Sequence, residues 1–168
     1  SLLLRSPDAA FALRALPARR IKESRSDIQK LILQGGFPVP ALMKSGVARR
    51  QWFSGYRATY LERDVRDLAA LEHLPEFGRL ISLIALRTGQ LINFADLSRD
   101  AGLPMMTLRR YCALLEATYQ FFLLPPYFTN LTKRLVKAPK LYVVDPGLAC
   151  YLSGADTWRI LDRQGRVG

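Results

Sequence analysis

A segment of two short helices followed by two apolar strands, between Asn93 and Tyr151, constrains the fold of this chain more than any other feature. Asn93 is a favourable N-cap, so we expect a short helix over residues 94–101. Gly102 permits a left-handed turn, and Pro104 suits the first position of a second helix that ends near Ala117. This spacing is typical of a helix-turn-helix.

The apolar pattern of this segment predicts which sides of the two helices touch. Apolar or small side chains fall at the expected contact positions, which are Leu97, Ala101, Leu103, Leu108 and Tyr111. The remaining positions of the second helix then point outward. Among them, Thr107, Arg109 and Arg110 would be presented to a major groove. Met105 and Met106 are less typical of base-reading positions and suit a hydrophobic protein contact equally well.

A basic hairpin is predicted after these helices, with strands at residues 120–124 and 140–144. Four positive charges lie near its tip, on Lys133, Arg134, Lys137 and Lys140. Between residues 101 and 144 the only acidic residue is Glu116. A surface with only positive charge favours binding to the phosphate backbone of a nucleic acid, because each neutralised phosphate releases counterions. The same charges could instead dock on an acidic neighbouring domain.

Helices are also predicted before this module. Residues 1–25 have the composition of a basic connecting arm. Ser26 can cap a helix that Gly35-Gly36 ends, and the following Phe37-Pro38-Val39-Pro40 is expected to be extended. A longer helix is predicted from about Ser45 to Leu71, because its apolar residues recur at helical spacing.

The last predicted helices complete the fold class. Pro75 is placed to start a helix that closes near Gly89, and the inward face of this helix is expected to carry Phe77, Leu80, Ile81, Ile84 and Ala85. Asp145 is expected to cap a short helix that ends at Leu152. The chain is therefore predicted to be mainly α with a small antiparallel β-hairpin. We divide it into a helical linker at residues 1–74, a winged helix-turn-helix domain at residues 75–152 and a tail at residues 153–168.

Composition favours a binding role over a self-contained enzyme. A formal net charge of +11 and a pI near 10.2 favour an anionic partner. Cys112 and Cys150 lie in apolar contexts, which indicates core thiols in a reducing compartment. Pro125 and Pro126 interrupt the longest uncharged stretch, so no membrane span is predicted. We expect a cytoplasmic protein, and the Ser1 start and open end indicate a fragment.

Candidate catalytic groups are few. The single histidine, His73, has no obvious metal-ligating neighbours and is expected to be a surface or capping group. Asp64 and Asp67 share a predicted helix with arginines, so ion pairing is expected rather than acid-base chemistry. Asp145 is interpreted as a helix cap. No catalytic residue and no metal ligand is therefore predicted in this chain.

Several short motifs, in this order, resemble a known family. They are Gly35-Gly36-Phe37-Pro38, Tyr60-Leu61-Glu62-Arg63-Asp64-Val65, Arg87-Thr88-Gly89-Gln90, Arg110-Tyr111 with Leu114-Leu115-Glu116, Asn130 with Lys133-Arg134-Leu135, and Pro139-Lys140-Leu141-Tyr142 with Asp145 and Gly147-Leu148. Together they resemble the predicted prokaryotic AAA+ ATPases that carry a C-terminal domain of unknown function. The resemblance covers nearly the whole chain and includes its first residues, which resemble the segment after the sensor strand of the ATPase core.

The resemblance implies that any chemistry belongs to other parts of a longer protein. The family carries an upstream Walker A loop, but this sequence contains no Gly-Lys-Ser or Gly-Lys-Thr. ATP and magnesium are thus expected only for an absent N-terminal module, with no cofactor in this chain. A nuclease-like domain would follow residue 168. Arg63 could reach the nucleotide of a neighbouring subunit, or it could form an ion pair with Asp67.

Two functions remain open from the sequence. The first is a non-enzymatic module that binds double-stranded DNA or couples it to an ATPase, through the outward helix and the basic hairpin. The second is a protein-interaction or homo-oligomerisation module, in which Met105, Met106 and Tyr127-Phe128 are buried against another subunit. A third possibility, a divergent nucleotide site, is disfavoured by the missing phosphate loop.

Overall fold

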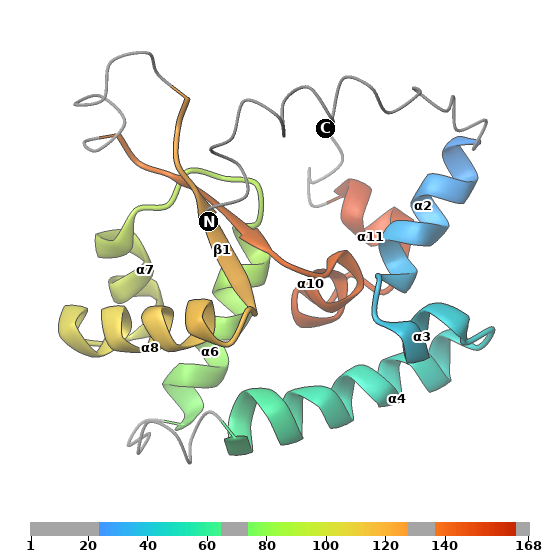
Figure 1. Cartoon of the computed structure of the whole chain (residues 1–168), viewed down its shortest axis with the longest axis horizontal. Helices are drawn as coiled ribbons and strands as arrows, with labels where there is room; N and C mark the ends of the chain where they lie inside the picture. The colour runs from blue at the N-terminus through green and yellow to red at the C-terminus, as the bar shows by residue number, and fades with distance from the viewer. Residues whose placement is uncertain (1–23, 65–73, 128–136, 164–168) are drawn as a thin grey trace, which may run out of the picture.

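Helices make up most of the chain in the computed structural model, and two strands form one small sheet (Figure 1). The structure describes residues 24–64, 74–127 and 137–163. In these ranges the elements are α2 (Arg25–Gln34), α3 (Pro38–Leu42), α4 (Gly46–Tyr56), the π-helix η1 (Arg57–Asp64), α6 (Leu74–Leu86), α7 (Phe94–Ala101), α8 (Met105–Ala117), β1 (Phe121–Leu124), β2 (Lys140–Val143), α10 (Pro146–Leu152) and α11 (Trp158–Arg163). The predicted class, mainly α with a small antiparallel sheet, is confirmed.

The α7–α8 pair forms as its local signals predict. The Asn93 side chain accepts hydrogen bonds from the backbone N–H groups of Ala95 and Asp96, which caps α7. Gly102 ends α7 at a φ of 71°, in the left-handed region that glycine adopts without strain. Pro104 occupies the N-cap of α8 rather than its first helical position. The predicted contact residues are all buried, namely Leu97, Ala101, Leu103, Leu108 and Tyr111.

The sheet follows this pair directly. β1 and β2 are antiparallel, with Phe122 opposite Tyr142 and Leu124 opposite Lys140. Residues 89–92 run along the other edge of β2 and exchange backbone hydrogen bonds with residues 139–141. The inward positions of the strands, Phe121 and Leu141, are buried, whereas the outward face is exposed to a large degree.

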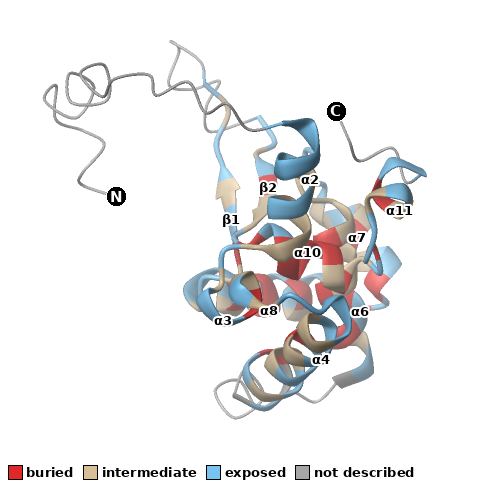
Figure 2. Cartoon of the chain, turned by 90° about the vertical axis from the view of Figure 1, so that its right-hand side faces the viewer, coloured by how far each residue is buried: buried red, intermediate tan, exposed pale blue. Residues whose placement is uncertain are grey.

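The core lies where α6 meets α7, α8, α10 and the sheet, as the buried residues in Figure 2 indicate. The inward face predicted for α6 is confirmed, because Phe77, Leu80, Ile81, Ile84 and Ala85 are all buried. The ring of Phe77 meets that of Tyr111 edge to face, with centroids 5.3 Å apart. This packing fixes one side of α8 against the core and therefore decides which residues of α8 face solvent.

Two predictions for the region before α6 were wrong. The first helix is capped by Ser24, not Ser26, because Ser24 and Asp27 form a capping box. Phe37-Pro38-Val39-Pro40 was predicted to be extended, but α3 begins at Pro38. Proline lacks an N–H group, and the first turn of a helix does not use those groups, so two prolines near a helix start are compatible with it.

The long helix predicted from Ser45 to Leu71 is described as far as Asp64, and in that part its hydrogen-bonding pattern changes. α4 is followed by the π-helix η1, and the residues after Asp64 lie outside the described ranges, as does His73. Phe53 of α4 and Leu61 of η1 are buried in the same core as α6. The proposed boundaries between linker, winged domain and tail stay predictions.

Candidate nucleic-acid interface

The outward face of α8 carries the predicted recognition residues. Arg109 and Arg110 are exposed, and Thr107 is partly buried. Met106 exposes 83% of its surface and Met105 36%, so the methionines share the solvent-facing side. The opposite side of the helix is fixed in the core by its buried residues, which are Leu108, Tyr111, Cys112 and Leu115.

Both arginines of α8 rest against aromatic rings. The guanidinium carbon of Arg109 lies 4.8 Å from the ring centroid of Phe94, at the start of α7. That of Arg110 lies 5.5 Å from the ring centroid of Tyr111. A cation over a ring face is attracted by the ring quadrupole and retains N–H donors for another partner. Within the described ranges, neither side chain forms an ion pair.

The acidic residues of α7 are already neutralised. Asp96 forms an ion pair with Arg99, and Asp100 forms one with Arg87. These pairs reduce the negative charge that the helix beside α8 offers to Arg109. On α8 itself the acidic residue is Glu116, which lies near the C-terminal end of the helix. The N-terminal half of α8 is thus left with two cations.

Two of the four cations predicted for the hairpin lie among the residues that the structure describes. Lys140 and Lys137 are exposed, on β2 and just before it. Lys133 and Arg134 lie outside the described residues. Figure 1 shows α8 and the hairpin on the same side of the molecule, away from α2 and α11. The two elements that carry the predicted cations therefore lie on one side of the fold, as far as the described residues reach.

Arg63, the predicted contact to a neighbouring nucleotide, lies near the end of η1 with its side chain exposed. Its alternative partner, Asp67, lies outside the described residues. The choice between these two roles for Arg63 stays open.

Both cysteines are buried. Burial raises the pKa of the Cys112 thiol to about 12, so its thiolate, the form that acts as a nucleophile, is scarce at neutral pH. Cys150 is also buried, as predicted for both cysteines. Within the described part of the chain, no group of three or more His, Cys, Asp or Glu side chains could hold a metal ion.

Asp145 is a cap, as predicted, and it also joins two distant segments. One carboxylate oxygen accepts a hydrogen bond from the backbone N–H of Leu148 at 2.7 Å, which caps α10. The other accepts one from the backbone N–H of Gly36 at 2.6 Å, in the turn between α2 and α3. Two motifs of the family resemblance, at residues 35–38 and 145–148, therefore form one joint. No local pattern in the sequence predicted this contact.

The pocket beside α4 and α10 supports no separate site. It has a volume of about 350 Å³ and is lined by residues of α2, α4 and α10 and by residues 154–156, which follow α10. Both arginines that line it have partners within the chain. Arg50 forms an ion pair with Asp156, and Arg49 donates hydrogen bonds to the backbone oxygens of Pro40 and Met43. The remaining lining is mostly apolar. The charged side chains that line the pocket are therefore paired within the chain, and we assign no ligand to it.

Comparison with known proteins gives a family but no activity. No solved structure matches the chain, and none of the helices in the described ranges could cross a membrane. The chain is 33% identical over 156 residues to the uncharacterized proteins Mb2031c of Mycobacterium bovis and Rv2008c of Mycobacterium tuberculosis, an alignment that covers 93% of this chain and 35% of each relative. It thus spans about a third of the length of these curated relatives.

The chain also matches the sequence model of a protein-domain family. The model of that family, described as a domain of unknown function, matches residues 25–159 and so includes every element from α2 to the start of α11. The chain accordingly belongs to the DUF8612 family.

Proposed function

We propose that this chain is a non-catalytic nucleic-acid-binding module of a longer, cytoplasmic AAA+ ATPase-like protein. The single observation that carries the proposal is the pair of exposed arginines, Arg109 and Arg110, on the outward face of α8 without an ion pair in the described residues. We interpret α6, α7, α8 and the β1–β2 hairpin as a winged helix. Their order along the chain and the turn at Gly102 support that interpretation.

In this proposal α8 and the hairpin bind double-stranded DNA through its phosphates. Arg109, Arg110 and Thr107 lie in or over a groove, and the hairpin cations grip the backbone on either side. The net charge of +11 attracts the polyanion over a long range. Met105 and Met106 offer no hydrogen bonds to base edges, so the binding is expected to depend little on sequence.

The proposed coupling of DNA binding to an ATPase is supported by the motif resemblance and by the greater length of the relatives. Because the chain covers 35% of its relatives, other domains of a similar parent would supply further activities. ATP and magnesium would bind in a separate ATPase module, whose movement would reposition this one on DNA. Arg63 would sense the nucleotide of a neighbouring subunit in a homo-oligomer.

The experiment is a binding titration of a fluorescent DNA duplex at several salt concentrations. Replacing both Arg109 and Arg110 by alanine should weaken binding and lower the slope of log affinity against log salt by about two, since each phosphate contact contributes about one. Arg159→Ala is the matched control, because Arg159 is an exposed arginine on α11. An unchanged slope in the double variant, or an equal change in the control, would reject the proposal.

A second candidate function is supported by the exposure of Met106 at 83% and Tyr127 at 86%. Flexible thioethers suit a packed protein contact, so these residues could bury against another subunit. Light scattering distinguishes the two functions. A dimer that Met106→Ser dissociates, together with no affinity for DNA, would favour the oligomerisation module.

A further inference from the structure

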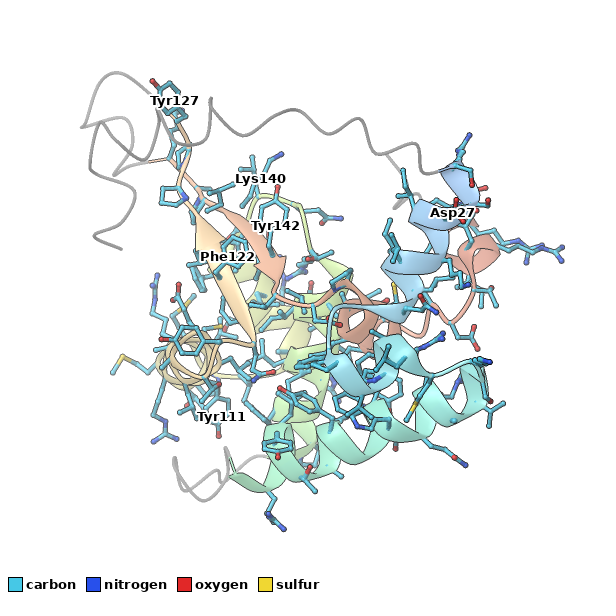
Figure 3. The ribbon with its side chains drawn as sticks, turned by 45° about the vertical axis from the view of Figure 1, so that its right-hand side comes forward. Asp27, Tyr111, Phe122, Tyr127, Lys140 and Tyr142 are labelled. Carbon is cyan, nitrogen blue, oxygen red and sulfur yellow. The ribbon has the colours of Figure 1, made fainter. Side chains whose placement is uncertain are left out.

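The outward face of the β1–β2 hairpin is aromatic, exposed and distinct from the α8 face. Phe122 of β1 and Tyr142 of β2 lie directly opposite each other in the sheet. Their rings stack, with centroids 5.5 Å apart and planes inclined by 18°. Phe122 nevertheless exposes 44% of its surface, and its neighbour on the same face, Leu124, exposes 49%. Figure 3 shows Phe122, Tyr142 and Lys140 together on the hairpin.

The stack is supported from one side. The Tyr142 ring lies close to Gly89, where an added Cβ would stand 3.9 Å from its Cε1 atom. The adjoining backbone is held in place, because the N–H of Val143 donates to the hydroxyl of Thr88 at 2.9 Å. Tyr142 is thus packed between the turn at Gly89 and the Phe122 ring, and Phe122 is the more exposed ring of the pair.

The charge around this face is of one sign. Lys140 lies opposite Leu124 on the same outward side, and its side chain is exposed. The described segments that form the hairpin, residues 118–127 and 137–144, contain no acidic residue. Tyr127, 86% exposed, continues the aromatic character of β1 beyond its last residue.

We propose that this face binds single-stranded nucleic acid by stacking an unpaired base on Phe122, while Lys140 contacts an adjacent phosphate. Every base has a flat face, so aromatic rings bind single strands with little sequence preference when a cation holds the backbone. An acidic peptide would use Lys140 but would gain little from the stacked rings. A purely apolar partner would gain nothing from the lysine. A single strand uses both features, because its bases stack on the rings and its phosphates contact the lysine.

This inference rests on the proposed function and specifies its substrate. α8 and the other hairpin cations contact duplex phosphates, whereas the aromatic face of the hairpin and Lys140 bind the single strand, so a duplex with a single-stranded tail would engage both surfaces. Two binding surfaces on one chain raise the affinity for a substrate that spans both, because the second contact forms within the complex. The expected substrate is therefore a junction between double-stranded and single-stranded nucleic acid.

The test compares three fluorescent probes on the whole chain: a blunt duplex, the same duplex with a thymidine tail, and oligothymidylate alone. The tailed duplex should bind most tightly. Phe122→Leu retains an apolar side chain but removes the ring, and it should weaken binding of the tailed duplex and oligothymidylate about tenfold or more, without affecting the blunt duplex. Phe122→Trp should retain the affinity, and the fluorescence of the new indole should be quenched by oligothymidylate.

Tyr60→Leu is the matched control. Tyr60 is another exposed aromatic residue in a stacked pair, with Tyr56, but it lies on η1. This substitution should leave the affinity for all three probes unchanged.

The possible failures are distinguishable. Tight binding of the blunt duplex with no gain from a tail would overturn this inference and leave the proposed function in place. Tail binding that depends on Phe122, without duplex binding, would support the inference and reject duplex recognition by α8. If no probe binds and Phe122→Leu dissociates a dimer, the face belongs to a second copy of the chain and both proposals fail.

Discussion

The joint around Asp145 and the outward face of α8 both contain residues of the family-like motifs, but the two regions have opposite physical character. Asp145 exposes only 6% of its surface and accepts two hydrogen bonds from backbone N–H groups. Arg109 and Arg110 face solvent. Motif membership alone therefore does not distinguish a residue that holds the fold from one that is free to meet a ligand.

The difference predicts opposite responses to substitution. A buried carboxylate is tolerated only when hydrogen bonds replace the water it has lost, so its partners are as important as the group itself. An exposed arginine retains its hydration and contributes little to folding. Substitutions at the joint should therefore lower the free energy of unfolding, whereas substitutions on α8 should alter binding.

The largest effect is expected at Gly147, beside Asp145. A Cβ added there would lie 2.8 Å from the carbonyl carbon and oxygen of Gln34 and from the Cα of Gly35. These are backbone atoms, which cannot rotate away as a side chain can. Gly147→Ala should lower the free energy of unfolding by about 3 kcal/mol, as overpacking does in rigid sites. Urea denaturation followed by circular dichroism measures this loss.

Gly55→Ala provides the matched control for that substitution. Gly55 lies within α4, and a Cβ there would meet no atom within 4 Å. Alanine favours helices over glycine, so this variant should gain about 0.5–1 kcal/mol. Equal stabilities of the two variants would show that α2 and α10 do not meet as closely as described.

Asp145→Ala should have the next largest effect, about 2–3 kcal/mol. It removes the cap of α10 and also leaves the Gly36 N–H without its acceptor. Asn93→Ala removes an exposed cap at the start of α7 and should cost about 1 kcal/mol. Thermal unfolding of the two variants compares them, and a smaller loss for Asp145→Ala than for Asn93→Ala would contradict the role of the joint.

The sequence predicted the elements whose signals are local. The bounds of α7, the cap at Asn93 and the buried face of α6 were all obtained correctly, because capping residues and helical spacing act over a few neighbouring positions. The joint was not predicted, since Gly36 and Asp145 are 109 positions apart and nothing local links them. α3 was missed because two prolines usually indicate an extended segment.

The candidate site was predicted in part for the same reason. Helical spacing places Arg109 and Arg110 on the outward side of α8, and the structure confirms their exposure. The stack of Phe122 on Tyr142 depends on strand register, which the apolar run at residues 120–124 does not specify. Alternation along β1 could have indicated its outward face.

Substitution of Arg109 on α8 is expected to have the smallest effect on stability, in contrast to substitutions around Asp145. Arg109→Ala removes a cation from the Phe94 ring, an exposed contact of about 0.5–1 kcal/mol. Arg109→Lys retains the charge and should recover part of that loss. Urea denaturation should therefore show nearly native stability for a variant whose DNA affinity has fallen. A loss as large as that of Asp145→Ala would mean that Arg109 holds the α7–α8 pair together, and the outward face of α8 would then be structural as well.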